Sequence, residues 1–264
     1  MMGIASFTLF RLAYIRSSAL GRVGLIFFGL LLATPAILFA SNYVLLIPYA
    51  LWFYEFHAMP GAEITAGLAA AILGVMYASA KLRPSKLNTP ILVICTVLVF
   101  ALLVTPFAKQ LFYAVDYTSL DNKWKDGICI QTSSYTCVPA CVATLARLQE
   151  MHLTEPELAQ AAGTTKRGTE YWYLARALRH KGYEPELHHV RSIKDAPVPS
   201  VVGVNLGDIG HVVVLLSKDK YGVNIGEPLR GRCHYSWLVF NRCYKPDGMC
   251  ITINKLDKRN KANK

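Results

Sequence analysis

Three long stretches without a charged residue dominate the first 113 residues of this sequence. They cover residues 23–54, 64–80 and 87–108, and are 32, 17 and 22 residues long. Each reaches or approaches the roughly 20 residues that a helix needs to cross a bilayer core. Three such runs in succession, with no alternating polar face, are not typical of buried helices in a soluble protein. The first run is also too long for a cleaved signal peptide. We therefore predict an α-helical transmembrane module over residues 1–113, with three spans at these positions.

The density of charged residues changes near residue 114. Residues 1–113 carry seven basic and two acidic groups, whereas residues 114–264 carry 21 basic and 15 acidic groups. The second part has the charge density of a soluble domain, and about 150 residues can bury a core without disulfides. We predict a globular domain over residues 114–254. The basic residues 255–264 are expected to form a solvated tail rather than a nucleic-acid-binding arm, so no nucleic acid is expected as a partner.

The basic residues of the N-terminal part predict its orientation, because cytoplasmic loops are enriched in Lys and Arg. The first apolar run is either one tilted helix or a hairpin broken at Ser41-Asn42. With three spans, six basic residues lie in the cytoplasm: Arg11, Arg16, Arg22, Lys81, Arg83 and Lys86. With four spans, the last three of these would face outward. We therefore expect an integral protein of the cell or inner membrane, in contact with lipid, whose C-terminal domain lies outside the cytoplasm.

The soluble domain begins with helical patterns. Apolar residues recur at helical spacing after Cys137, and Pro139 suits the first turn of a helix. Cys137 is therefore expected at a helix N-terminus. The run Thr154-Glu-Pro-Glu157 is a capping box that opens a second helix, which ends at Gly163. Thr169 can cap a third helix over residues 170–181.

Short segments rich in Val and Ile follow these helices. We expect strands at residues 186–190, 201–206, 211–216, 221–225 and 249–253, because each is bounded by Gly, Pro, Asp or Asn. Helices first and strands afterwards predict an α+β domain with a mostly antiparallel sheet.

Four residues of this domain have the properties that a thiol-dependent hydrolase needs. At a helix start, the partial positive charge favours the thiolate of Cys137. His211, at the start of an apolar strand, can share the thiol proton and later protonate a leaving amine. Glu227 ends the next strand and can orient the imidazole if the two strands are antiparallel neighbours. Gln131 precedes the thiol by six residues, so its amide can join the Cys137 backbone N–H in stabilising an oxyanion.

The motifs that contain these residues are similar to those of the bacteriocin-processing, double-glycine leader peptidases. These are papain-like cysteine peptidases, often fused to peptide-exporting ABC transporters. Within residues 126–240 the shared motifs are, in order, Gln-x5-Cys-x-Pro-Ala-Cys, Ala-Gly-Thr-Thr-x-x-Gly-Thr, Gly-His-Val-Val-Val-Leu and a strand ending in acid-Pro. The resemblance implies a papain-like fold, with Cys137 as nucleophile, His211 as general base and Gln131 as oxyanion donor.

The sequence departs from the family's usual motifs at two places. Glu227 stands where the family usually has aspartate, and Thr136-Cys137-Val138 stands where it favours Asp-Cys-Gly. The second departure bears on specificity more than on chemistry, because neither flanking residue transfers a proton. The family implies a peptide substrate cleaved after a double-glycine-type motif, and a peptide-export transporter as partner. Since a Gly-x4-Gly-Lys-Ser/Thr loop is absent from the sequence, we expect a peptidase rather than the transporter itself.

Other uses of the same residues remain open at this level. A catalytically silent peptide-binding domain can present substrates to an exporter, and a thiol redox protein can use Cys137 with Cys141. A metal site would need these thiols to converge with His211 or His234. Because no Cys-x2-Cys pair exists, the sequence favours neither a metal nor another cofactor.

The remaining cysteines raise the question of disulfides. An extracytoplasmic domain of this kind can form one or two of them. The candidates are Cys129, Cys233, Cys243 and Cys250. The pairing among them does not follow from the sequence.

Overall fold

The structure, a computed structural model, describes residues 2–17, 27, 31, 34, 51–82 and 88–255. It divides into two compact units. One unit takes Met1–Pro48 and Met59–Lys109, and the other takes Tyr49–Ala58 and Gln110–Lys264. The short helix α3 (Leu51–Ala58) therefore belongs to the unit that contains the polar half of the sequence.

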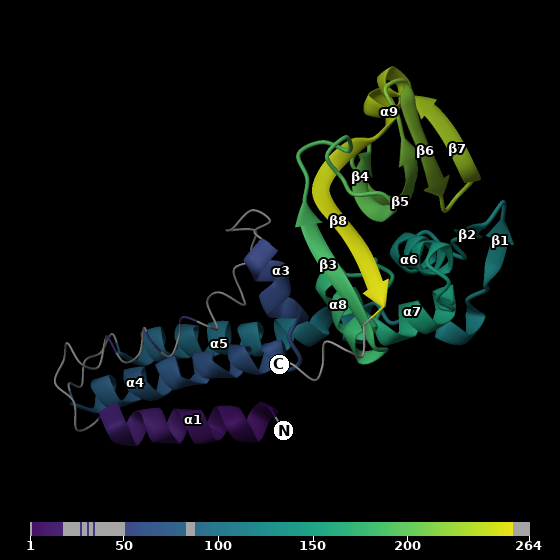
Figure 1. Cartoon of the computed structure of the whole chain (residues 1–264). Coiled ribbons are helices and arrows are strands. Elements are labelled where there is room, and N and C mark those ends of the chain that lie inside the picture. Colours follow the sequence, from purple (N-terminus) through teal and green to yellow (C-terminus); the bar gives the residue numbers. More distant parts are fainter. Residues whose placement is uncertain are drawn as a thin grey trace, which may run out of the picture. The chain divides into compact units, whose positions relative to one another are not determined.

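Helices form the described part of the first unit (Figure 1). They are α1 (Met2–Ser17), the 3-10 helix η1 (Ala62–Leu68), α4 (Ala69–Leu82) and most of α5 (Asn88–Phe112). α1 lies close against α4 because Gly74 has no side chain. A Cβ atom there would come within 2.5 Å of the Phe10 carbonyl oxygen. Ala69 and Leu73 of α4 pack with Val99 of α5 in a small apolar core.

The three predicted membrane spans map onto this unit unequally. Of the first, residues 23–54, only 27, 31, 34 and 51–54 belong to the described residues. The second coincides with η1 and α4, and the third with α5. Within the described ranges, no helix is by itself long and apolar enough to cross a membrane. Leu51–Ala58 and Ala62–Tyr77 meet that criterion only when they are taken together as a broken pair.

The second unit combines helices with two sheets. Its helices are α3, η2 (Tyr117–Ser119), α6 (Cys137–Leu148), α7 (Glu155–Ala161), α8 (Tyr171–His180) and α9 (Trp237–Cys243). α6 starts at Cys137 as predicted and is the central helix, since every residue from Cys137 to Ala146 is buried.

The caps of α7 and α8 differ from each other. At α7 the predicted capping box is present, with Thr154 and Glu157 each bonding the other's backbone N–H. At α8 the N-cap is Glu170, whose side chain makes no capping hydrogen bond. The prediction that Thr169 caps this helix is wrong, because its hydroxyl is 2.7 Å from the Thr164 hydroxyl in the preceding turn and is engaged there.

The main sheet has six strands, all antiparallel, in the order β3-β8-β4-β5-β6-β7. Its strands are β3 (Tyr183–His189), β4 (Ser200–Leu206), β5 (Ile209–Lys218), β6 (Gly222–Glu227), β7 (Gly231–Ser236) and β8 (Lys245–Lys255). A separate hairpin pairs β1 (Lys123–Lys125) with β2 (Ile128–Ile130). The predicted α+β class with an antiparallel sheet is confirmed, and the hairpin, β7 and α9 are additions to it.

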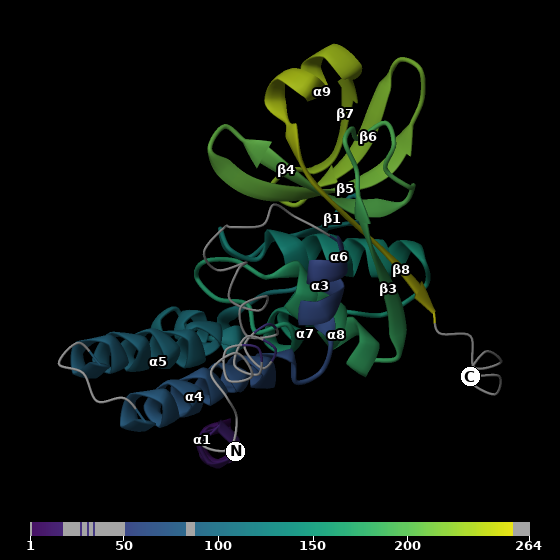
Figure 2. The same cartoon turned by 90° about the vertical axis from the view of Figure 1, so that its left-hand side faces the viewer.

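The apolar side chains of β5 point alternately to the two faces of the sheet, and so they belong to two different cores. Val212 and Val214 pack with α6 and α8, whereas Val213 and Leu215 pack with Phe240 of α9. Figure 2 shows α6 and α9 on opposite sides of the sheet. The strand is buried on both faces, which explains its continuous run of apolar residues.

The seven cysteines all lie in the described part of the chain, and none of them forms a disulfide. The expectation of disulfides is therefore wrong, for a reason of placement. Cys129 lies in the core beside α6, whereas Cys250 lies in the core beside α9. Three strands separate β8, which carries Cys250, from β7, which carries Cys233.

Candidate active site

Cys137 is the first residue of α6 and is only 9% exposed. The preceding residue, Thr136, is the N-cap, but its hydroxyl bonds Ser133 instead of the first turn of the helix. The first backbone N–H groups of a helix have no acceptor within the helix. The thiol therefore lies where backbone donors and the helix dipole favour negative charge.

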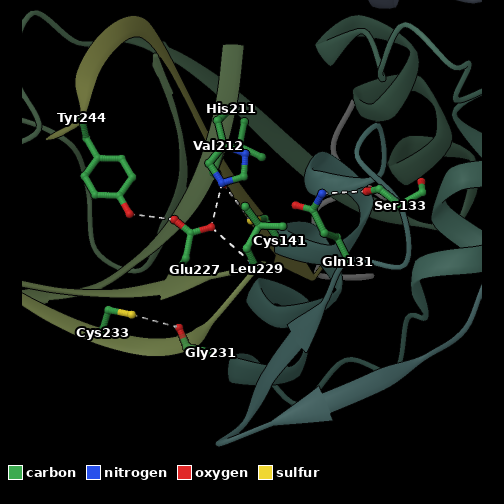
Figure 3. A network of polar contacts seen from close by, with 10 residues as sticks. All are labelled: Gln131, Ser133, Cys141, His211, Val212, Glu227, Leu229, Gly231, Cys233 and Tyr244. Atoms are coloured by element: carbon green, nitrogen blue, oxygen red, sulfur yellow. Dashed lines mark hydrogen bonds and ion pairs between the residues drawn. The ribbon is translucent and has the colours of Figure 1, made fainter. Parts of the chain in front are cut away.

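The strands β5 and β6 bring His211 and Glu227 together. Val214 pairs with Gly226 in this antiparallel ladder, so Glu227 ends its strand diagonally across from His211. The His211 Nε2 atom lies 2.7 Å from Glu227 Oε1 (Figure 3). Because Nε2 is taken by the carboxylate, Nδ1 is the ring nitrogen left for the Cys137 thiol, which helps to raise the pKa of His211. The imidazole thus interacts with both the thiol and the carboxylate.

Burial and pairing act in opposite directions on the pKa values of this pair. For His211, burial is the largest influence and lowers the pKa, but the bonds and charges of Cys137 and Glu227 together raise it to about 9. For Glu227, burial raises the pKa, but the imidazole and two further donors lower it overall. The pair is therefore an imidazolium beside a carboxylate at neutral pH.

Two of the donors to Glu227 were not predicted from the sequence. The Tyr244 hydroxyl, just after α9, donates to Oε2 at 2.9 Å, and the Leu229 backbone N–H donates to Oε1 at 3.3 Å (Figure 3). Both Oε1 and Oε2 are then fixed, so the carboxylate cannot rotate away from His211. Tyr244 follows Glu227 by 17 residues and belongs to a different element, and no local pattern marks it.

Gln131 lies on the loop that leads from β2 to α6. Its backbone N–H donates to the Pro228 carbonyl at 2.9 Å, which attaches this loop to the residue after Glu227. Its side-chain nitrogen donates to the Ser133 carbonyl at 2.6 Å (Figure 3). An amide nitrogen carries two N–H groups. One is therefore used to hold the side chain against its own loop, and a second is left for a ligand.

Cys141 differs from Cys137 although both belong to α6. It is fully buried, and its thiol donates to the Val212 carbonyl at 3.4 Å. Burial, followed by the negative charges nearby, raises its pKa well above the ordinary value for a thiol. Cys141 therefore stays a protonated core residue.

One residue considered for a metal site, His234, is engaged elsewhere. The His234 Nδ1 atom is 3.0 Å from Asn224 Oδ1 on the neighbouring strand β6, and His234 is exposed. Among the residues that the structure describes, no three His, Cys, Asp or Glu side chains are grouped so that they could hold a metal ion.

A comparison with known proteins identifies the family of the domain that contains these residues. Residues 125–258, about half of the chain, match the sequence profile of the peptidase C39 family. The chain belongs to the peptidase C39 family. Its polar unit is a cysteine peptidase domain with a papain-like α+β fold. The departures from the usual motif, at residues 136–138 and at Glu227, lie within this C39 domain.

Two relatives and several solved structures are similar to this chain over part of its length. The chain is 34% identical over 122 residues to an uncharacterized protein of Methanothermobacter thermautotrophicus, covering 44% of this chain and 82% of that protein. It is 32% identical over 114 residues to another from Methanothermobacter marburgensis, covering 43% of this chain and 80% of that protein.

Among solved structures, a double glycine motif protease from an AMS/PCAT transporter, in complex with the leader peptide, is 18% identical. Its TM-score is 0.43 over 52% of this chain and 96% of that one. The peptidase domain of Streptococcus ComA is 20% identical, with a TM-score of 0.43 over 50% and 99%.

Proposed function

We propose that this C39 domain hydrolyses peptide bonds with Cys137 as nucleophile, His211 as general base and acid, and Glu227 as the residue that orients the imidazole. The observation that carries the proposal is the placement of the His211 ring, which lies 2.7 Å from Glu227 and interacts with the thiol at the start of α6. A base between a nucleophile and an orienting acid is the arrangement of nucleophilic catalysis.

The proposed reaction proceeds in two halves. The Cys137 thiolate attacks the scissile carbonyl carbon, and the resulting oxyanion accepts hydrogen bonds from the Cys137 backbone N–H and the second amide N–H of Gln131. The imidazolium of His211 donates its proton to the amine, which leaves as the C–N bond breaks and a thioester remains. His211 then takes a proton from water, whose oxygen attacks the thioester carbon. The C–S bond then breaks, the carboxylate product leaves with release of one proton, and the thiolate–imidazolium pair is restored.

The proposed substrates are leader segments of secreted peptides, cleaved after a double-glycine-type motif. Membership of the C39 family and the four ordered sequence motifs support this substrate class. A peptide exporter that receives the mature peptide is the corresponding proposed partner.

We also propose that the N-terminal unit anchors the peptidase in a membrane, with the peptidase outside the cytoplasm. The distribution of basic residues supports this orientation. Helix α5 supports the anchoring, because it exposes many large apolar side chains that lipid would cover. They are Ile91, Val93, Ile94, Val97, Leu98, Phe100, Phe107, Leu111 and Phe112.

The test of the catalytic proposal uses the full chain in detergent with synthetic leader peptides that contain a Gly-Gly site. Cys137→Ala and His211→Ala should abolish turnover, by about 10⁴-fold or more, because each removes a group that takes part in bond making. Glu227→Gln should cost less, up to about 100-fold, because it disturbs orientation. Cys243→Ala, which removes an exposed thiol, is the matched control and should retain full activity.

A peptide chloromethyl ketone separates the proposal from its alternatives. Covalent labelling of Cys137 in the native protein, absent in Cys137→Ala, excludes a catalytically silent peptide-binding domain. Retained turnover in the Cys137 variant would overturn the nucleophile assignment. A dominant Cys137–Cys141 disulfide in the non-reduced protein would do so in favour of a redox role.

A further inference from the structure

A buried carboxylate lies beneath the loop that leads to the nucleophile. Glu155 is the first residue of α7 and is 0% exposed. It takes no part in the capping box, which Thr154 and Glu157 complete without it. A buried carboxylate is costly unless hydrogen bonds satisfy it, so its position requires partners.

The partners of Glu155 are groups of the loop over residues 131–136 and of the strand before it. The Thr132 backbone N–H donates to Oε1 at 2.9 Å. The hydroxyls of Thr132 and Thr136 lie close enough to lower the pKa of this carboxyl group, although burial raises it overall. The Cys129 thiol donates to Oε2 at 4.0 Å, and its pKa is raised to about 12 by burial and by the charge of Glu155, so it remains a donor.

These contacts hold both ends of the loop. Thr132 directly follows Gln131, and Thr136 directly precedes Cys137. The opposite side of the loop is attached to the end of β6, because the Gln131 N–H donates to the Pro228 carbonyl. Glu155 is therefore the inner anchor of the segment that carries the two proposed oxyanion donors.

We infer that Glu155 is a positioning residue, which fixes the Gln131 amide and the Cys137 backbone N–H at the separation that an oxyanion requires. This inference rests on the proposed function. Glu155 does not touch the reacting atoms, and it acts through Thr132 and Thr136. Donors that stabilise a transition state must be held in position before the reaction begins. A loose loop would therefore lower kcat and leave the affinity for the substrate largely unchanged.

A carboxylate is suited to this position because donors face its oxygens. The Thr132 backbone N–H donates to one of them and the Cys129 thiol to the other. A Gln side chain has nearly the same shape but replaces one acceptor oxygen with an NH₂ group. That group would face a donor, so the loop would lose one attachment and shift.

The experiment compares Glu155→Gln with Glu157→Gln in the full chain. Glu157 lies two residues away on the same helix and is exposed, so its substitution weakens the cap of α7 without touching the loop. For Glu155→Gln we expect kcat to fall by about 100-fold, the cost of losing one oxyanion donor, with KM within about twofold. The affinity for a peptide aldehyde, which forms a tetrahedral adduct, should fall by a similar factor. Glu157→Gln should change none of these.

The rate at which iodoacetamide alkylates Cys137 distinguishes an effect on the oxyanion donors from a disturbance of the whole active site. This substitution makes no oxyanion, so its rate depends on the thiolate and His211 and should stay within about twofold in Glu155→Gln. If the alkylation rate falls together with kcat, or if kcat and aldehyde affinity stay unchanged, the inference is wrong. Should Glu155→Gln fail to fold, Glu155→Asp, which keeps both acceptor oxygens but shortens their reach, tests the same attachment, with the same pattern expected at a smaller amplitude. Failure of the proposed function would appear in a different measurement, because the Cys137→Ala variant would then turn over substrate at the wild-type rate.

Discussion

The charge on His211 has consequences for both activity and stability. The pKa of the ring lies at about 9 instead of 6.5, so it is protonated at neutral pH and can protonate a leaving amine. The folded-state pKa is raised, and the pairing therefore stabilises the fold fully below about pH 6.5. That stabilisation is lost as the pH rises through about 9.

The Glu227 carboxylate can be tested as a source of this shift. In Glu227→Gln, the amide keeps an acceptor for the ring but removes the negative charge, so the alkaline limb of kcat/KM should move from about pH 9 towards 6.5. The pH dependence of unfolding over the same range should weaken in parallel. Asp208→Asn removes a negative charge from the exposed turn before β5, and its alkaline limb should stay near that of the wild type. An unmoved limb in Glu227→Gln would show that this carboxylate does not set the pKa of His211.

The sequence indicates some site residues and gives no sign of others. Cys137 and His211 follow local signals, namely a helix start and the start of an apolar strand. The approach of Glu227 follows from pairing two consecutive strands. Tyr244 and Glu155 have no such signal, because each meets the site across a distance of many residues and only packing brings it there. Glu155 lies between the two residues of a capping box, and the sequence alone gives no reason to distinguish it from the solvated acidic residues that are common at helix N-termini.

At the scale of elements, α3 contributes an apolar face to the peptidase core. Tyr54 is 3% exposed, and its ring centroid lies 5.6 Å from that of Trp172 on α8. Arg176 donates to the His57 carbonyl at 2.6 Å and so satisfies an acceptor in the last turn of α3. The pair of Glu55 and Arg179 is half-exposed and contributes at most about 1 kcal/mol. The aromatic contact should therefore dominate the attachment.

Tyr54→Ala tests this attachment. Loss of a buried aromatic ring should lower the free energy of unfolding by about 3 kcal/mol. Trp52→Ala on the same helix removes a side chain that is 53% exposed, and should cost less than about 0.5 kcal/mol. Thermal unfolding of the full chain in one detergent compares the two variants. Equal small losses would mean that α3 is not part of the peptidase core.

The elements that sequence patterns predict are those with a strong period or a defined cap. α6 has both apolar spacing and Pro139, and α7 has its capping box. By contrast, β7 alternates exposed and half-buried residues at the sheet edge, and α9 buries only Phe240. Their apolar content is too low to distinguish them from a loop. The membership of α3 in the peptidase unit is also invisible locally, because it depends on packing against α8, more than 100 residues later.

At the scale of the whole molecule, α3 constrains how the chain can cross a membrane. Residues 51–58 and residues 110–264 belong to one unit, so they must lie on the same side. If the intervening residues 59–109 cross the bilayer as proposed, they must do so an even number of times. The predicted spans at 64–80 and 87–108 would give two crossings and put the basic loop between them on the opposite side from the peptidase. Because basic loops favour the cytoplasm, this arrangement supports the proposed position of the peptidase outside it.

Reporter fusions test this arrangement at three points. Alkaline phosphatase, which is active only outside the cytoplasm, should be active when fused after Ala58 and after Lys264, and inactive when fused after Arg83. A fluorescent protein that matures only in the cytoplasm should give the complementary pattern. The first and last positions must agree, because both flank segments of one folded unit. Opposite signals at Ala58 and Lys264 would contradict two crossings between them. A cytoplasmic signal at both would keep the two crossings but reverse the orientation, because the first apolar run would then cross as a hairpin or remain on the inner side.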